Sequence, residues 1–189
     1  MKKSLKIHYF LAWEGYTEYK IFSYLTRNRF RGQFLKSDIR FRDAINITQG
    51  EIIISNGKLN GVGDKTNFKS KYLILKKYYP DETFFFFLDE DLYDSSEIEQ
   101  MIKMGGDFVQ FIKYNSEYLL LKLSNFNLKN PEDFDRLEDF RQYCKDEFYE
   151  RFRKKASEMK EAELEQIFKK ISEDEIKDIF NELFLIAGI

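Results

Sequence analysis

Two almost continuous apolar runs constrain the fold of this chain more than any other feature. They read KIHYFLAW at residues 6–13 and TFFFFL at residues 83–88. A strand with one solvent-exposed face alternates apolar and polar side chains, whereas a strand that is covered on both faces is apolar throughout. Both runs therefore predict central strands of a parallel sheet with helices on its two faces.

The segments around these runs alternate between helix and strand patterns. We expect a helix over 17–30, one or two strands within 38–54, a glycine-rich loop over 55–66, and a helix over 67–79 that Pro80 ends. A further helix is expected from residue 95, then a strand within 105–114, and a segment at 115–123 that fits either a helix or a strand. Such alternation is typical of an α/β fold with a Rossmann-type parallel sheet.

The composition changes after residue 129. Asn130 and Pro131 suit the N-cap and first position of a helix, and Ser172 with Glu175 has capping-box spacing before the expected last helix. We therefore expect an α/β domain over 1–129 and a helical C-terminal extension over 130–189 that packs on it.

Composition excludes several classes of protein. The chain has 189 residues and a net charge of −2, so no overall positive field marks a protein that coats nucleic acid. Cys144 is the only cysteine and His8 the only histidine, which leaves no material for a disulfide, a thiolate zinc site or a His-rich metal site. The first apolar run meets Glu14 without a cleavage site, and no run approaches the ~20 residues that cross a bilayer. We expect a cytoplasmic protein that does not bind a membrane.

Both apolar runs end in acidic residues. Glu14 and Glu18 flank a glycine after the first run, and Asp89 and Asp91 follow the second. Ligands of open parallel sheets bind at the carboxyl ends of the strands, and Asp89 and Asp91 point the same way along their strand. Carboxylates crowded there need a cation or a bound proton, and an all-oxygen ligand set suits Mg²⁺ or Mn²⁺. The plainer alternative, acids that stabilise a helix dipole, accounts for Glu18 alone.

The motifs EGYTE and LDED, in this order and each after a buried strand, resemble the Toprim domain. That family includes bacterial primases, topoisomerases and the OLD and RloB-like proteins of bacterial and phage defence loci. The segment WEGYTEYKIFSYL is most similar to the OLD and RloB-like branch, and the likeness covers residues 6 to 125 at the level of elements.

The resemblance implies phosphodiester chemistry with Mg²⁺ or Mn²⁺, with two ions in the site. By this resemblance Glu14 acts in acid–base or metal chemistry, Asp89 and Asp91 bind the cation and take part in catalysis, and Glu18 is a further metal ligand.

The segment YNSEYLLLKL at 114–123 is also similar to the one that follows the last core strand of RloB-like proteins, although Ser116 replaces a proline and a terminal histidine is absent. This similarity makes Glu117 a candidate ligand of a second ion. The alternative is that Glu117 only opens a helix, stabilised by the helix dipole.

Two basic segments are candidate nucleic-acid contacts. The loop GKLNGVGDKT is not a P-loop, because Asp64 separates Gly63 from Lys65, but Lys58 and Lys65 can reach a nucleic-acid backbone. The cluster RFRKK at 151–155 can do the same, although such clusters more often form a solvated helix face.

The expected function is that of a metal-dependent nuclease in a bacterial or phage defence setting, acting on DNA or RNA. The chain carries no ATPase motif of its own, so the OLD-like resemblance implies a separate ATPase or other defence-system partner. Two alternatives stay open. One is a non-catalytic Toprim-like subunit, either a partner-binding protein or an immunity factor. The other is a phosphatase of the haloacid dehalogenase type, with Asp89 as nucleophile and Asp91 as acid.

Overall fold

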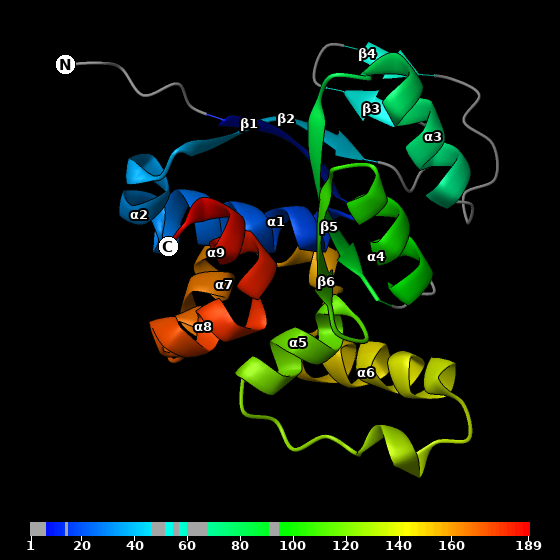
Figure 1. The fold of residues 1–189 in the computed structure, drawn as a ribbon. Coiled ribbons are helices and arrows are strands. Elements are labelled where there is room, and N and C mark those ends of the chain that lie inside the picture. Colours follow the sequence, from blue (N-terminus) through cyan, green and yellow to red (C-terminus); the bar gives the residue numbers. More distant parts are fainter. Residues whose placement is uncertain (1–6, 14, 47–51, 55–56, 60–67, 91–94) are drawn as a thin grey trace.

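A computed structural model describes residues 7–13, 15–46, 52–54, 57–59, 68–90 and 95–189, and for 42–46, 52–54, 57–59 and 95 it describes the backbone alone. The protein is an α/β fold with a mainly parallel sheet between two layers of helices (Figure 1). The strands are β1 (Ile7–Trp13), β2 (Ile39–Asn46), β3 (Ile52–Ile54), β4 (Gly57–Leu59), β5 (Thr83–Asp89) and β6 (Phe108–Ile112). The predicted fold class is confirmed.

The sheet has the strand order β4-β3-β2-β1-β5-β6. Strands β2, β1, β5 and β6 run parallel, whereas β3 and β4 pair antiparallel at one edge. The two apolar runs of the sequence, β1 and β5, lie side by side at the centre. Strand β6 borders β5, as expected for consecutive parallel strands.

Helices follow the strands in the order that the hydrophobic patterns predict. They are α1 (Tyr16–Tyr24), a π-helical turn (Leu25–Arg29), α2 (Arg31–Lys36), α3 (Phe68–Tyr78), α4 (Ser95–Met104), α5 (Ser116–Leu123), α6 (Leu137–Phe152), α7 (Glu161–Phe168), α8 (Glu173–Ile179) and α9 (Asn181–Ala187). Short 3-10 helices span Pro131–Asp133 and Ala156–Glu158. The ambiguous segment at 115–123 is thus helical, and the helix expected over 17–30 is α1 with the π turn, after which α2 follows at once.

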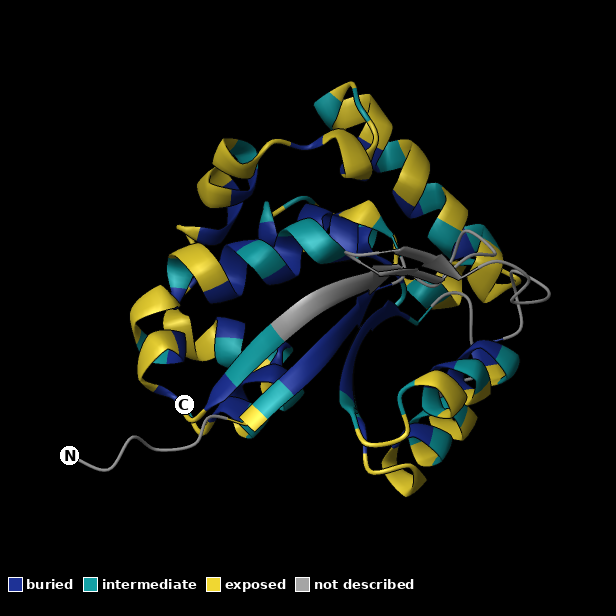
Figure 2. Ribbon diagram, turned by 90° about the horizontal axis from the view of Figure 1, so that it is seen from above, coloured by how far each residue is buried: buried dark blue, intermediate teal, exposed yellow. Residues whose placement is uncertain are grey.

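Side-chain alternation along the central strands builds two hydrophobic cores, one on each side of the sheet. Phe85 and Phe87 belong to the larger core, which α1 and the C-terminal helices cover. Phe84, Phe86 and Leu88 belong to the smaller core under α3 and α4. Figure 2 shows the buried strands between these helical layers. The run of phenylalanines is therefore apolar throughout because each face of β5 meets a different helical layer.

The C-terminal helices share the larger core with the sheet, since Phe148, Phe168 and Phe180 pack in the same cluster as Phe85 and Phe87. Strand β6 supports one of these helices directly. The Gln110 carboxamide oxygen accepts hydrogen bonds from the Glu182 and Leu183 amides, at 3.1 and 3.4 Å, in the first turn of α9. A side chain of the sheet thus satisfies amides that a helix start leaves without partners.

Three details differ from the sequence-based expectations. The glycine-rich loop contains the strand β4, because its backbone pairs with β3. Asn130 and Pro131 begin only a 3-10 turn, and Phe134 then adopts an extended conformation in which its ring packs 5.5 Å from that of Phe140. Ser172 does cap a helix, since its hydroxyl accepts the Glu175 amide hydrogen at 3.2 Å, but α9 follows that helix.

Candidate carboxylate site

The candidate site lies where the topology of the sheet changes direction. The chain passes from β1 to β2 on one side and returns to β5 on the other, so the crevice at the carboxyl ends of β1 and β5 is a topological switch point. Such crevices are the usual ligand sites of open parallel sheets. Trp13 at the end of β1 pairs with Phe87, and Asp89 pairs with Ile112 of β6. The neighbouring strands β1, β5 and β6 therefore have their carboxyl ends on the same side of the sheet.

Asp89 is the last residue of β5 and lies on the same side of the strand as Phe85 and Phe87, facing α1. Its side chain is buried, with 7% of the residue exposed. One oxygen, Oδ2, accepts a hydrogen bond from the Ser116 amide at 3.1 Å, and Oδ1 accepts one from the Ser116 hydroxyl at 2.8 Å. Asp89 is thereby held at the first residue of α5, where the helix dipole favours an anion.

Glu18 reaches the same hydroxyl from the first turn of α1. It is 4% exposed, and its Oε1 lies 2.6 Å from the Ser116 Oγ. Its other oxygen lies close to Gly15, since a Cβ atom on Gly15 would stand only 2.6 Å from Oε2. Gly15 has an ordinary extended backbone, so this glycine is required for space and not for conformation.

The backbone before α5 is fixed by several contacts that set the position of Ser116. Tyr114 has a left-handed backbone with φ of 62°, and its amide donates to the Glu90 Oε2 at 3.1 Å. Asn115 caps α5 by accepting the Tyr118 amide hydrogen at 2.8 Å, and its own amide group donates to the Arg141 carbonyl at 3.2 Å. Glu90, between the two predicted ligands Asp89 and Asp91, thus supports the turn.

The composition of this cluster, Glu18, Asp89 and Ser116, limits its chemistry; we call it the carboxylate site. A serine hydroxyl has a single hydrogen to donate, yet two carboxylate oxygens lie within hydrogen-bond distance of it. If both carboxylates are ionised, one of these short contacts has no hydrogen. The site is therefore a cluster of oxygen atoms that places two acidic side chains on one hydroxyl, a composition that suits a hard cation.

The carboxylate site fits a hard cation in donor chemistry, since every side-chain donor is oxygen. Glu18 and Asp89, two of the predicted metal ligands, come together in it. Glu14 and Asp91 lie outside the described residues. Within the described ranges no group of three or more His, Cys, Asp and Glu side chains is arranged to hold a metal ion. A complete coordination shell would therefore need Glu14, Asp91 or water in addition.

Glu117 lies one residue beyond Ser116, in the first turn of α5, and is half-buried. Its charge helps to raise the pKa of the Cys144 thiol on α6, an effect that burial dominates. Glu117 thus has an electrostatic neighbour in the α6 layer, and its role as a metal ligand stays a prediction.

Most of the predicted basic contacts lie outside the described residues or form ion pairs within the protein. Lys65 and the side chain of Lys58 lie outside the described residues. In the 151–155 cluster, Arg151, Arg153 and Lys154 form ion pairs with Glu147, Glu150 and Glu163, respectively. Only Arg151 lies on α6, whereas Arg153 caps the end of that helix and Lys154 follows it, so these ion-paired side chains lie around the helix end and do not form one helix face.

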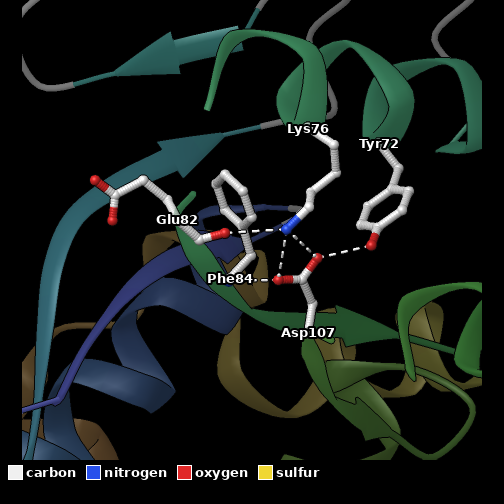
Figure 3. Close-up of polar contacts among 5 residues, drawn as sticks. All are labelled: Tyr72, Lys76, Glu82, Phe84 and Asp107. Atoms are coloured by element: carbon white, nitrogen blue, oxygen red, sulfur yellow. Dashed lines mark hydrogen bonds and ion pairs between the residues drawn. The ribbon is translucent and has the colours of Figure 1, made fainter. Parts of the chain in front are cut away.

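A second buried carboxylate, at the amino ends of the strands, has a structural role. Asp107 precedes β6 and accepts hydrogen bonds from the Tyr72 hydroxyl at 2.7 Å and from the Phe84 amide at 2.9 Å. Lys76 lies 3.2 Å from it, donates to the Glu82 carbonyl at 3.0 Å, and has its ammonium over the Phe84 ring (Figure 3). This network joins α3 to the amino ends of β5 and β6, away from the carboxylate site.

Comparison of the chain with protein-family models, with curated proteins and with solved structures gives no match. In the part of the chain that the structure describes, no helix combines the length and apolar character needed to span a membrane.

Sequence reasoning found Asp89 and Glu18 but gave Ser116 no role in the site. The expected strand within 105–114 brings Ser116 to the same rim as the acids, but the serine is otherwise only a departure from the RloB-like pattern. The available signal was its position directly after Asn115, a good N-cap residue, at the end of a predicted strand.

Proposed function

We propose that this protein is a divalent-cation-dependent nuclease whose reaction centre is the carboxylate site. The observation that carries the proposal is the meeting of Glu18 and Asp89 on the Ser116 hydroxyl at the switch point of the sheet. Here two buried acids from different elements, α1 and β5, converge at the place where open parallel sheets bind their ligands. The motif resemblance to the Toprim family supports the same chemistry.

In this proposal the residues have distinct roles. Glu18 and Asp89, with Asp91, would hold Mg²⁺ or Mn²⁺, which when bound would activate water and stabilise charge on the leaving oxygen. Ser116 fixes the orientation of both buried carboxylates. Glu14, the residue directly after β1, accepts the proton of the attacking water.

The phosphatase alternative receives less support from the geometry. That alternative also uses Asp89, as the nucleophile, but it gives no role to the buried Glu18, which meets Asp89 at the Ser116 hydroxyl. The non-catalytic alternative predicts a folded protein without response to divalent cations.

The test uses the full chain with labelled single-stranded DNA, single-stranded RNA and duplex DNA, in the presence of Mn²⁺. We expect cleavage by the wild type and a rate that is about 10²–10⁴-fold lower in Glu14→Gln, the size of effect typical of a lost general base. Asp89→Asn and Glu18→Gln are expected to remove the Mn²⁺-dependent rise in melting temperature. Glu138→Gln, an exposed acid in the first turn of α6, is the matched control and should behave as the wild type.

Two results would contradict the proposal. One is a wild-type protein that neither cleaves these substrates nor shows a Mn²⁺-dependent melting shift, which would favour the non-catalytic subunit. The other is cleavage by Asp89→Asn at the wild-type rate and with the wild-type dependence on Mn²⁺.

A further inference from the structure

A groove of about 530 Å³ runs beside α1, on the outer side of the helix from Glu18. We call it the α1 groove. One wall is the face of α1 that carries residues spaced three or four apart, and the other is formed by the segment 158–161 and by Leu164 of α7. The first wall consists of Tyr16, Tyr19, Lys20, Ser23 and Tyr24 from α1 and of Arg27 and Asn28 from the π-helical turn that follows it. Lys20 donates to the Ser157 and Met159 carbonyls, at 2.7 and 2.8 Å, and so ties the two walls together.

Aromatic rings line the end of the α1 groove that is nearest to the carboxylate site. Tyr16, the first residue of α1, is 61% exposed, and its ring meets that of Tyr19 edge-to-face at 6.3 Å. Tyr19 in turn lies 4.5 Å from the Trp13 ring at the end of β1. The Tyr16 ring therefore has surface that a ligand in the groove can contact.

Cationic and polar groups accompany these rings. The Lys20 ammonium lies 5.6 Å from the centre of the Tyr16 ring, and the Arg27 guanidinium lies 6.0 Å from that of Tyr19. Arg27 also donates to the Tyr19 hydroxyl at 3.4 Å. Among the described residues, the buried Ser23 hydroxyl in the groove wall has no hydrogen-bond partner, and neither does the buried Trp13 indole N–H.

We propose that the α1 groove binds single-stranded nucleic acid, with bases stacked on Tyr16 and Tyr19 and the backbone near Arg27. Alternating aromatic and cationic side chains along a groove are the recognition elements of single-strand binding, because every base has a face that can stack. The acids Glu158 and Glu161 also line the groove, where the first accepts a hydrogen bond from the Lys155 amide and the second one from Asn28. The cations Lys20, Arg27 and Lys160 outnumber these two acids along the groove. A duplex presents no free base faces and should bind less well.

The inference rests on the proposed nuclease function only in treating the bound strand as the substrate. Tyr16 and Glu18 are two residues apart on α1, so the groove and the carboxylate site lie on different sides of this helix. The inference extends the proposed function by naming single-stranded nucleic acid as the substrate class.

Binding can be measured without cleavage, by the fluorescence anisotropy of labelled dT and U oligonucleotides of about 12 residues in EDTA. Tyr16→Ser should raise Kd about 5- to 150-fold, the equivalent of one lost stacking contact. Tyr149→Ser is the matched control, because Tyr149 is a comparably exposed tyrosine (52%) on α6 and does not line the groove. Arg27→Gln should weaken binding and lower the slope of log Kd against log salt by about one unit. Comparison of the dT and U oligonucleotides distinguishes DNA from RNA.

The outcomes separate this inference from the nuclease proposal. If Tyr16→Ser and Tyr149→Ser both bind with the wild-type Kd, or if duplex binds as tightly as single strand, the α1 groove is not the binding site, whether or not the wild type cleaves. If binding depends on Tyr16 and Arg27 but Mn²⁺ produces no cleavage, the groove stands and the nuclease proposal fails. A wild type that binds neither oligonucleotide at micromolar concentration would overturn the groove assignment.

Discussion

The Asp107 network offers the most quantitative test of how the fold is held together. Its carboxylate is fully buried, whereas the Lys76 side chain is 24% exposed. Replacement of Asp107 by leucine removes the acceptor for the Tyr72 hydroxyl and for the Phe84 amide, and it removes the partner of the Lys76 ammonium. The expected result is a large loss of stability with little effect on the carboxylate site. The network lies at the amino ends of the strands, whereas the carboxylate site lies at their carboxyl ends.

The magnitude follows from the groups left without partners. A buried donor that loses its acceptor costs about 1–3 kcal/mol, and here the Phe84 amide and the Tyr72 hydroxyl both lose theirs. Lys76 adds only about 0–1 kcal/mol, since it is partly exposed and keeps the Glu82 carbonyl. We therefore expect Asp107→Leu to lower the free energy of unfolding by about 4 kcal/mol, out of the 5–15 kcal/mol typical of a domain.

Urea unfolding, followed by tryptophan fluorescence and by circular dichroism, measures this change, and coincident transitions check two-state behaviour. Gly105→Ala is an independent perturbation of the same network, because its Cβ would lie 1.7 Å from the Tyr72 hydroxyl and would drive it away from Asp107. The double variant Lys76→Met/Asp107→Leu should be less destabilised than the sum of the single variants. A loss below 1 kcal/mol in Asp107→Leu would refute the assignment of this network as a main stabilising feature.

Three further predictions follow from single contacts. Gly15→Ala should lower the Mn²⁺-dependent rate of nucleic-acid cleavage at least about tenfold, because the new Cβ displaces the Glu18 carboxylate from Ser116. It should cost only about 1 kcal/mol of stability. Wild-type activity of the variant on the same substrates would contradict this. Gln110→Leu should cost about 2–4 kcal/mol in urea unfolding, since the first turn of α9 loses its acceptor, and a change within 0.5 kcal/mol would speak against it. Burial raises the pKa of the Cys144 thiol from 9.0 to about 12, so iodoacetamide at pH 8 should modify Cys144 only as fast as the protein unfolds. Because the pKa of this thiol is higher in the folded than in the unfolded protein, the thiol contributes stability below pH 9 and loses that contribution as the pH rises toward 12. Cys144→Ala should remove this pH dependence from the free energy of unfolding, measured across that range.

The sequence by itself determined the two central strands, because a strand that is buried on both faces must be apolar at every position. The run Phe84–Leu88 could therefore be assigned without knowledge of the rest of the fold. Helix periodicity likewise placed α1 and α3, capping-box spacing placed the start of α4, and the rule that consecutive parallel strands are often neighbours placed β6 beside β5. These features depend on local pattern and on general rules of chain connection.

Only the tertiary structure decided which polar groups meet. Ser116 is separated from Asp89 by 27 residues and from Glu18 by 98, and no local pattern specifies that one hydroxyl lies between the two carboxylates. Their meeting depends on the register of β5 against β6, on the left-handed turn at Tyr114, and on the position of α1 over the sheet. The 3-10 turn after Asn130 has the same kind of cause, since packing of the Phe134 ring overrides a good helix-start sequence. Periodicity records how deeply a side chain is buried, whereas its partners are set by the packing of segments that are distant in the chain.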